Sequence, residues 1–233
     1  MNQSTSRGKP KPAEIHARFQ RALADHQQGR LGIAQAGYEA VLSVEPRHCD
    51  AIYFLGVIAE QQGRHEDALE MLRRAIEIEP RHAHAHMTTG GALTALGRVD
   101  EALAAYDQAI SLQGDLAEAW SNRGNVLIQL ARLDEAVKSF ERAVALKPGL
   151  PAAWLNLGNA LCLSARPAEA LKQYQVAAAL RPRDALVLFD WGQALEMLGK
   201  RSEATSKYEA ALTIDPQSSE VKAALARVSR RPI

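Results

Sequence analysis

The sequence has 233 residues, of which 47% are apolar and 24% are charged, and its formal net charge is +1. This apolar content is too high for a wholly disordered chain. Lysines and arginines are spread along the sequence, whereas a protein that binds polyanions concentrates them on one face, so we expect no nucleic-acid partner.

The N-terminus and the cysteines bear on the compartment. Residues 1–14 carry a few charges but no apolar stretch after them, so we expect a flexible tail and not a signal peptide. The two cysteines, Cys49 and Cys162, indicate no disulfide framework. No run approaches the ~18 apolar residues that span a bilayer. We therefore expect a cytoplasmic protein without a membrane partner.

Residues that stop helices recur at intervals of 34 from residue 46 to residue 216. Five are prolines, and Gly114 takes the remaining place: Pro46, Pro80, Pro148, Pro182 and Pro216. This spacing predicts six units without insertion or deletion, over residues 15–48, 49–82, 83–116, 117–150, 151–184 and 185–218.

Each unit is predicted to form two helices. Apolar or small residues at unit positions 4, 7, 8 and 11 make one stripe at helical spacing, and those at 20, 24, 27 and 28 make another. Small residues at positions 8 and 20 let the helices approach closely, and a large residue at position 24 fills the gap. One helix pair cannot bury both stripes. The units must therefore stack into an all-α, right-handed superhelical solenoid.

The two ends depart from this pattern. In the first unit Arg18 and Arg21 take positions 4 and 7, and the apolar stripe is displaced to Ile15, Phe19, Ala22 and Leu23. We expect a rotated first helix that caps the N-terminal end. Residues 219–229 are predicted to form a C-terminal capping helix whose buried side carries Val221, Ala224, Leu225 and Val228, and residues 230–233 a tail.

The columns W-x2-LG…A…Y/F…A…P resemble the tetratricopeptide repeat, and the resemblance covers residues 15–218. The segment HQQGRLGIAQAGYEAVLSVEPRH also resembles the leading repeats of bacterial O-GlcNAc-transferase-like proteins. The resemblance implies a concave face, lined by positions 2, 5, 6, 9, 12 and 13 of the first helices, that binds extended peptides. It also implies a non-catalytic scaffold or adaptor for protein–protein interaction.

Asparagines at positions 6 and 9 are the main candidates for peptide binding. The fold does not require them there, and an amide offers both a donor and an acceptor to a partner's backbone. The ladder at position 6 is similar to that of O-GlcNAc transferases, where it holds acceptor polypeptides; solvated surface residues are the alternative. The candidate set is Asn122, Asn125, Asn156, Asn159, Gln193, Asp190, Thr88, Tyr53, Phe54, Val57 and Phe189.

Charge on the expected concave face bears on the partner. Its 36 positions hold no Lys or Arg but five acids, namely Asp50, Glu60, Glu118, Asp190 and Glu196. We therefore expect a neutral or basic peptide and not an acidic C-terminal one.

Apolar residues at both ends of the same face suggest patches that bind a ligand or a second copy of the chain, which would give a homo-oligomer. The N-terminal patch comprises Phe19, Leu23, Tyr53, Phe54 and Val57, and the C-terminal one comprises Leu186, Phe189 and Met197.

Catalytic and metal sites are not expected. His82 and His86 could share a metal ion, but their segment straddles a turn and offers no fourth ligand. No nucleophile–base set recurs, so we expect no enzyme activity and no cofactor. Three functions stay open: an adaptor, the substrate-binding module of a transferase whose catalytic domain lies outside these residues, and a self-assembling scaffold.

Overall fold

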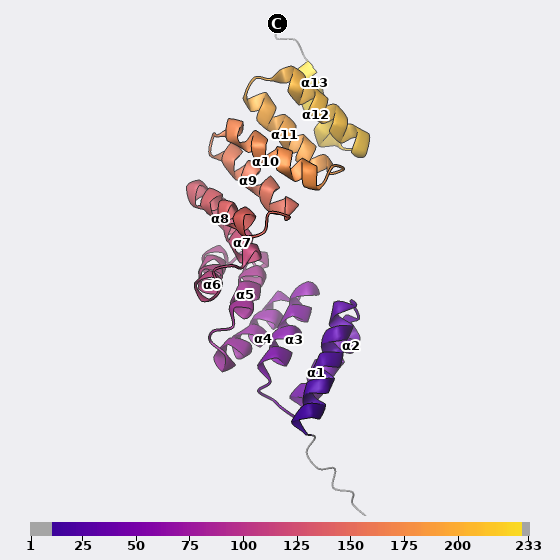
Figure 1. Ribbon diagram of the computed structural model, residues 1–233, viewed down its shortest axis with the longest axis vertical. Helices are drawn as coiled ribbons and strands as arrows, with labels where there is room; N and C mark the ends of the chain where they lie inside the picture. Colours follow the sequence, from indigo (N-terminus) through magenta and orange to yellow (C-terminus); the bar gives the residue numbers. More distant parts are fainter. Residues whose placement is uncertain (1–10, 230–233) are drawn as a thin grey trace, which may run out of the picture. The chain divides into compact units, whose positions relative to one another are not determined.

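The computed structural model describes residues 11–229, and all regular elements in that range are α-helices (Figure 1). The all-α class is confirmed. The described chain divides into two compact units, residues 11–114 and 115–229, called here the N-terminal and the C-terminal unit. Within residues 11–229 no helix is long and apolar enough to cross a membrane. Tails were expected at residues 1–14 and 230–233; of these, residues 1–10 and 230–233 lie outside the described residues, and residues 12–14 belong to a helix.

In the N-terminal unit each helix packs against the next one along the chain. Short turns join the helices, and alternate helices begin 34 residues apart, at Cys49 and at Ala83. The helices are α1 (Pro12–Gln27), α2 (Leu31–Leu42), α3 (Cys49–Gln61), α4 (His65–Ile78), α5 (Ala83–Ala95) and α6 (Val99–Leu112).

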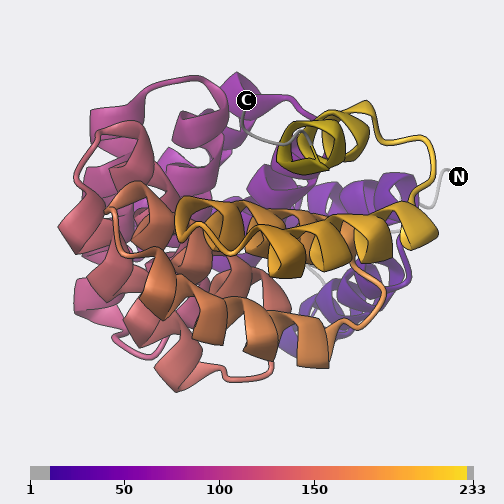
Figure 2. The ribbon, with the colours of Figure 1, turned by 90° about the horizontal axis from the view of Figure 1, so that it is seen from above.

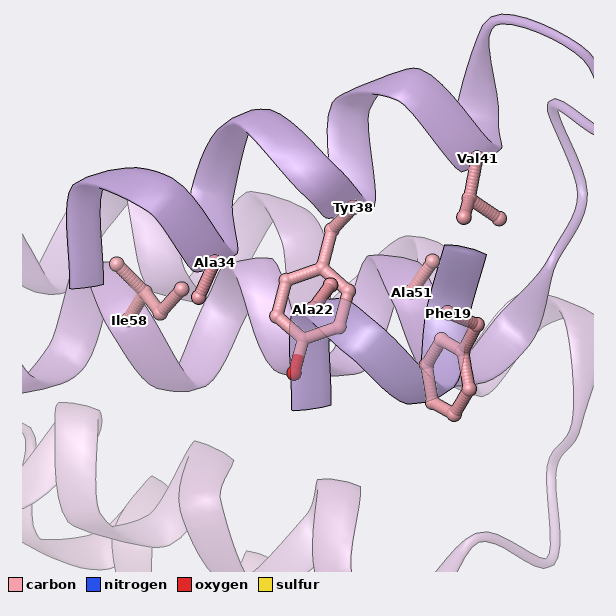
Figure 3. Close-up of a cluster of buried hydrophobic side chains, with 7 residues drawn as sticks. All are labelled: Phe19, Ala22, Ala34, Tyr38, Val41, Ala51 and Ile58. Carbon is pink, nitrogen blue, oxygen red and sulfur yellow. The ribbon is translucent and has the colours of Figure 1, made fainter. Parts of the chain in front are cut away.

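Helix α1 begins at Pro12, three residues before the expected start at residue 15. Proline suits the first turn because the N–H that it lacks has no partner there. The displaced apolar stripe is confirmed, since Phe19 and Ala22 are buried and Ile15 and Leu23 pack against the same cluster. Figure 3 shows this cluster. It joins α1 to α2 and α3 through Phe19, Ala22, Ala34, Tyr38, Val41, Ala51 and Ile58.

The C-terminal unit also stacks consecutive helices, and α13, the last of them, packs against α12 (Figure 2). Helix α13 occupies the residues expected for the capping helix: Val221, Ala224 and Val228 are buried, and Leu225 packs beside them. The helices are α7 (Ala117–Gln129), α8 (Leu133–Leu146), α9 (Pro151–Leu163), α10 (Pro167–Leu180), α11 (Ala185–Met197), α12 (Arg201–Ile214) and α13 (Ser219–Ser229).

The turn inside a helix pair uses one left-handed residue. After α3, Gly63 has φ +73°, its N–H bonds to Glu60 O and the N–H of Arg64 bonds to Ala59 O, each at 2.9 Å. This pair of bonds is the Schellman motif, which satisfies the last carbonyl groups of the helix. Alanine takes the left-handed position after α7 and α9, at Ala131 and Ala165, where a side chain costs about 1–2 kcal/mol.

Within a pair, a glycine of the first helix lies directly against the large residue of the second. A Cβ at Gly158 would be 2.5 Å from the ring of Tyr174, and one at Gly124 would be 2.7 Å from that of Phe140. Real Cβ atoms do not approach this closely. The close approach expected from the sequence columns is therefore confirmed.

We predict that Gly158→Ala destabilises the C-terminal unit by about 1–3 kcal/mol, because the fully buried ring of Tyr174 has no space to move into. Gly149→Ala is the matched control: a Cβ there meets nothing within 4 Å, so the change should stay within about 0.5 kcal/mol. Urea unfolding followed by circular dichroism measures both. Equal stability of the two variants would contradict the prediction.

Candidate polypeptide-binding surface

Asparagines of the C-terminal unit bond to residues of neighbouring first helices. Asn156 Nδ2 donates to Asn125 Oδ1 at 3.1 Å, and Asn159 Nδ2 donates to Asp190 Oδ2 at 2.9 Å. In both pairs the partners are 31 residues apart, so position 9 of one first helix meets position 6 of the next. Asn125, Asn156, Asn159 and Asp190 form a row over α7, α9 and α11, called here the polar row.

These contacts correct one expectation. The asparagines at positions 6 and 9 were expected to be exposed and without a part in folding, but Asn122, Asn125, Asn156 and Asn159 are all half-buried. Three of them are hydrogen-bonded to one another or to Asp190 or Tyr174. The reason is the stagger between helices, which brings the amides of adjacent first helices within reach of each other.

Tyr174 on α10 adds a group that the sequence analysis assigned to the core alone. Its ring is buried against Gly158, while its hydroxyl donates to Asn159 Oδ1 at 2.7 Å and lies 3.5 Å from Cys162 Sγ. Burial, together with Cys162 and Asp190, raises the pKa of this phenol. The sequence held one sign of this role. Position 24 is Tyr174 here but Phe140 in the preceding pair, so packing alone does not require a hydroxyl group.

Asp190 was expected on an open surface but is only 9% exposed. Burial raises the pKa of its carboxyl group, the hydrogen bond from Asn159 lowers it in part, and the charges of Asp184 and Glu220 raise it further. A buried carboxylate with one amide partner is poorly compensated, since charged groups normally leave water only when they are paired.

This carboxyl group borders an open hollow of about 390 Å³, called here the Asp190 hollow. Asn159, Asp190 and Tyr174 supply polar groups, and the exposed side chains of Leu163 and Met197 supply apolar ones. Gln193, another candidate from the sequence, also lines it. Phe189 lies instead beside the ring of Tyr208, with 5.9 Å between centroids.

Candidates in the N-terminal unit lie among aromatic rings. The ring of Phe54 stacks on that of Tyr38, with 5.5 Å between the ring centroids, and the centroid of the Tyr53 ring lies 5.0 Å from that of Phe54. Val57 is half-buried, and the hydroxyl of Thr88 donates to His84 O in its own helix. The apolar patch expected here is wrong for Phe19, which is 6% exposed and part of the core.

Two of the five acids pair with a lysine or an arginine from outside the 36 positions. Arg227 of α13 makes two hydrogen bonds to Glu196, at 2.7 and 2.8 Å, and lowers the pKa of that carboxyl group. Lys147, in the turn after α8, lies 2.7 Å from Glu118. Lys147 and Arg227 thereby offset the negative charges of Glu118 and Glu196. The partner of Asp190 is an uncharged amide, that of Asn159.

We predict that Asp190→Asn stabilises the protein at pH 7, because it removes a buried charge and keeps an acceptor for Asn159. A raised folded-state pKa means that protonation stabilises the fold below the unfolded pKa of about 3.9, and that this contribution is lost as pH rises through the folded pKa. The gain should therefore shrink as pH falls. Urea unfolding at several pH values measures it.

The control is Glu209→Gln, which changes charge equally at an exposed site on α12 and should alter stability by less than about 0.5 kcal/mol. Loss of stability in Asp190→Asn at pH 7 would mean that the carboxylate charge is favourable where it lies.

Comparison with protein families identifies the repeat. The model described as tetratricopeptide repeat matches residues 19–80, 62–117, 88–151, 121–163 and 155–219. The chain belongs to the tetratricopeptide repeat family. No curated protein matches the sequence.

Solved structures share the tetratricopeptide fold at low identity. The chain is similar to Pseudomonas aeruginosa PilF, with a TM-score of 0.81 and 23% identity over 91% of this chain and 97% of that one. For the type IV pilus biogenesis factor PilW the TM-score is 0.81, with 20% identity over 93% of this chain and 100% of that one. For YrrB, a TPR protein with an unusual peptide-binding site, the TM-score is 0.70, with 19% identity over 80% of this chain and 96% of that one. At these identities the likeness shows the fold alone.

Proposed function

We propose that this chain is a non-catalytic protein-interaction module that binds an extended polypeptide along the polar row of the C-terminal unit. The observation that carries this proposal is the row itself, which leads from Asn125 to the buried carboxyl group of Asp190. Membership of the tetratricopeptide repeat family supports a protein partner. So does the likeness to YrrB, whose description includes a peptide-binding site.

The internal hydrogen bonds leave capacity for a ligand. An amide has two N–H donors and an oxygen with two lone pairs, and the bond between Asn156 and Asn125 uses one donor of the first and one acceptor site of the second. The remaining groups suit the N–H and C=O groups of an extended backbone. Because the bond holds both side chains in place, less conformational entropy is lost when a ligand binds.

The Asp190 hollow selects a basic side chain of that polypeptide. Its carboxyl group provides a negative charge in a partly desolvated place, where a charge pair is stronger than in water. Leu163 and Met197 offer apolar surface to the methylene stem of a lysine or arginine, which packs along such surface while its charged end bonds. A neutral or basic ligand was expected from the sequence, and the proposal adds a specific contact between a Lys or Arg of that ligand and Asp190.

Further expectations stay predictions. These are the six-repeat division with residues 219–229 as its cap, the cytoplasmic location, self-association, and peptide contacts of Asn122, Gln193, Phe189, Tyr53, Phe54, Val57 and Thr88.

A displayed library of random peptides tests the proposal. We predict that wild-type protein enriches peptides with a Lys or Arg, and that Asp190→Asn weakens their binding by at least about tenfold, because a desolvated charge loses its partner. Asn156→Ala, which removes an amide of the row, should weaken binding of the same peptides. Calorimetry on purified peptides measures both effects.

Glu209→Gln is again the matched control and should bind as wild type does. Selection of acidic peptides, or equal affinity of wild type and Asp190→Asn, would contradict the basic-side-chain contact. Failure to enrich any peptide would contradict the proposed function.

A further inference from the structure

Three residues with metal-binding side chains meet in the N-terminal unit, and none of them belongs to the polar row. They are Cys49 at the start of α3, Glu79 just after α4 and His82 just before α5, and their ligand atoms lie within 4.8 Å of one another. Asp50 lies beside them, with its Oδ1 3.9 Å from His82 Nε2. Burial, followed by the charges of Glu79 and Asp50, raises the pKa of the Cys49 thiol to about 11.

The repeat accounts for the carboxylate and the imidazole in part, but not for the thiol. Glu45 and His48 hold the places of Glu79 and His82 one unit earlier, and His48 caps α3 as His82 caps α5, whereas Ile15 stands at the place of Cys49. Thirty-four residues after Cys49 the chain has Ala83, and the positions equivalent to Glu79 and His82 in that pair hold Gln113 and Leu116. The next pair has an alanine, a lysine and a leucine at the same places. An apolar or small residue therefore suffices at the place of Cys49, and a thiol joins the carboxylate and the imidazole in this unit alone.

We propose that Cys49, Glu79 and His82 bind a zinc ion. Sulfur, imidazole nitrogen and carboxylate oxygen are the ligands that zinc takes in proteins, and a soft thiolate favours zinc over calcium or magnesium. Asp50 or a water molecule completes four ligands. Ligand atoms around tetrahedral zinc sit roughly 3.5 Å apart, so the group closes by about 1 Å on binding. Glu79 is exposed at the end of α4 and can make this movement.

Binding exchanges two weak contacts for bonds to the ion. The Cys49 thiol lies 3.4 Å from Ala75 O, and its proton passes to solvent when sulfur binds zinc. His82 Nδ1 accepts the N–H of Ala85 at 3.1 Å. A neutral ring that coordinates through one nitrogen carries its proton on the other, so this cap of α5 is given up when the imidazole binds.

This pairing differs from the one considered on sequence grounds. His86, four residues after His82, turns its Nε2 toward Pro80 O at 3.1 Å. The partners of His82 are instead Cys49 and Glu79, which stacking brings to it from 33 and 3 residues away.

Cobalt titration of the full chain, reduced and free of oxygen, tests the proposal. Thiolate bound to Co²⁺ gives a charge-transfer band in the near ultraviolet, which Zn²⁺ removes when it displaces cobalt. We predict one equivalent of binding, loss of the band in Cys49→Ser and retention of the band in Cys162→Ser, the matched control for the other thiol. Absence of the band in wild type, its persistence in Cys49→Ser, or its loss in Cys162→Ser would overturn the site.

Two variants separate ligation from folding. His82→Asn removes the imidazole but keeps a side chain that caps helices well, and Glu79→Gln changes an exposed group. Each should weaken Zn²⁺ binding at least about tenfold, since even groups that only support a metal ligand contribute that much. Circular dichroism without metal should match wild type for both. Unchanged zinc affinity in both variants would overturn the proposal.

Discussion

The distance between the two helices of a pair depends on contact between a small residue and a large side chain. In α3, α5, α7, α9 and α11 the small residue is a glycine, and a Cβ there would come within about 3 Å of the large side chain opposite. The first pair reaches the same closeness differently. Ala22 replaces the glycine on α1, and Gly37 on α2 makes room for it, with a virtual Cβ 2.7 Å from that of Ala22. The helices can therefore approach closely whichever of them lacks the side chain.

Once this distance is set, the stagger between successive first helices follows, and it decides which functional groups meet. Residues 31 apart are neighbours in the polar row, and Arg227 and Glu196 at the C-terminal end have the same separation. The polar row is thus a structural feature of the C-terminal unit, and it is also the surface that we propose for a partner. Burial raises the pKa of the Asp190 carboxyl group, and groups whose pKa is shifted by burial are found more often at functional sites.

The two units carry different chemistry on one scaffold. In the N-terminal unit aromatic rings from α1, α2 and α3 pack together, and the junction of α3 with α5 gathers a thiol, an imidazole and carboxylates. In the C-terminal unit amides and one buried carboxyl group occupy the first helices. Function in a repeat protein therefore depends on the few positions at which one pair differs from the next.

The sequence by itself determined the all-α class, the 34-residue period, the buried columns and the two end helices. The period follows from residues that recur from unit to unit. The other features depend on residues close together in the sequence, where helical geometry alone relates position 8 to position 11 or position 20 to position 24. The tertiary structure alone decided that Asn156 bonds to Asn125, that the Tyr174 hydroxyl reaches Asn159, that Asp190 is buried and that Cys49 meets His82. Most of these contacts join different pairs or depend on how the pairs stack. Where these side chains point depends on the distance and the stagger between packed helices. The spacing of residues within one helix pair carries no information on either.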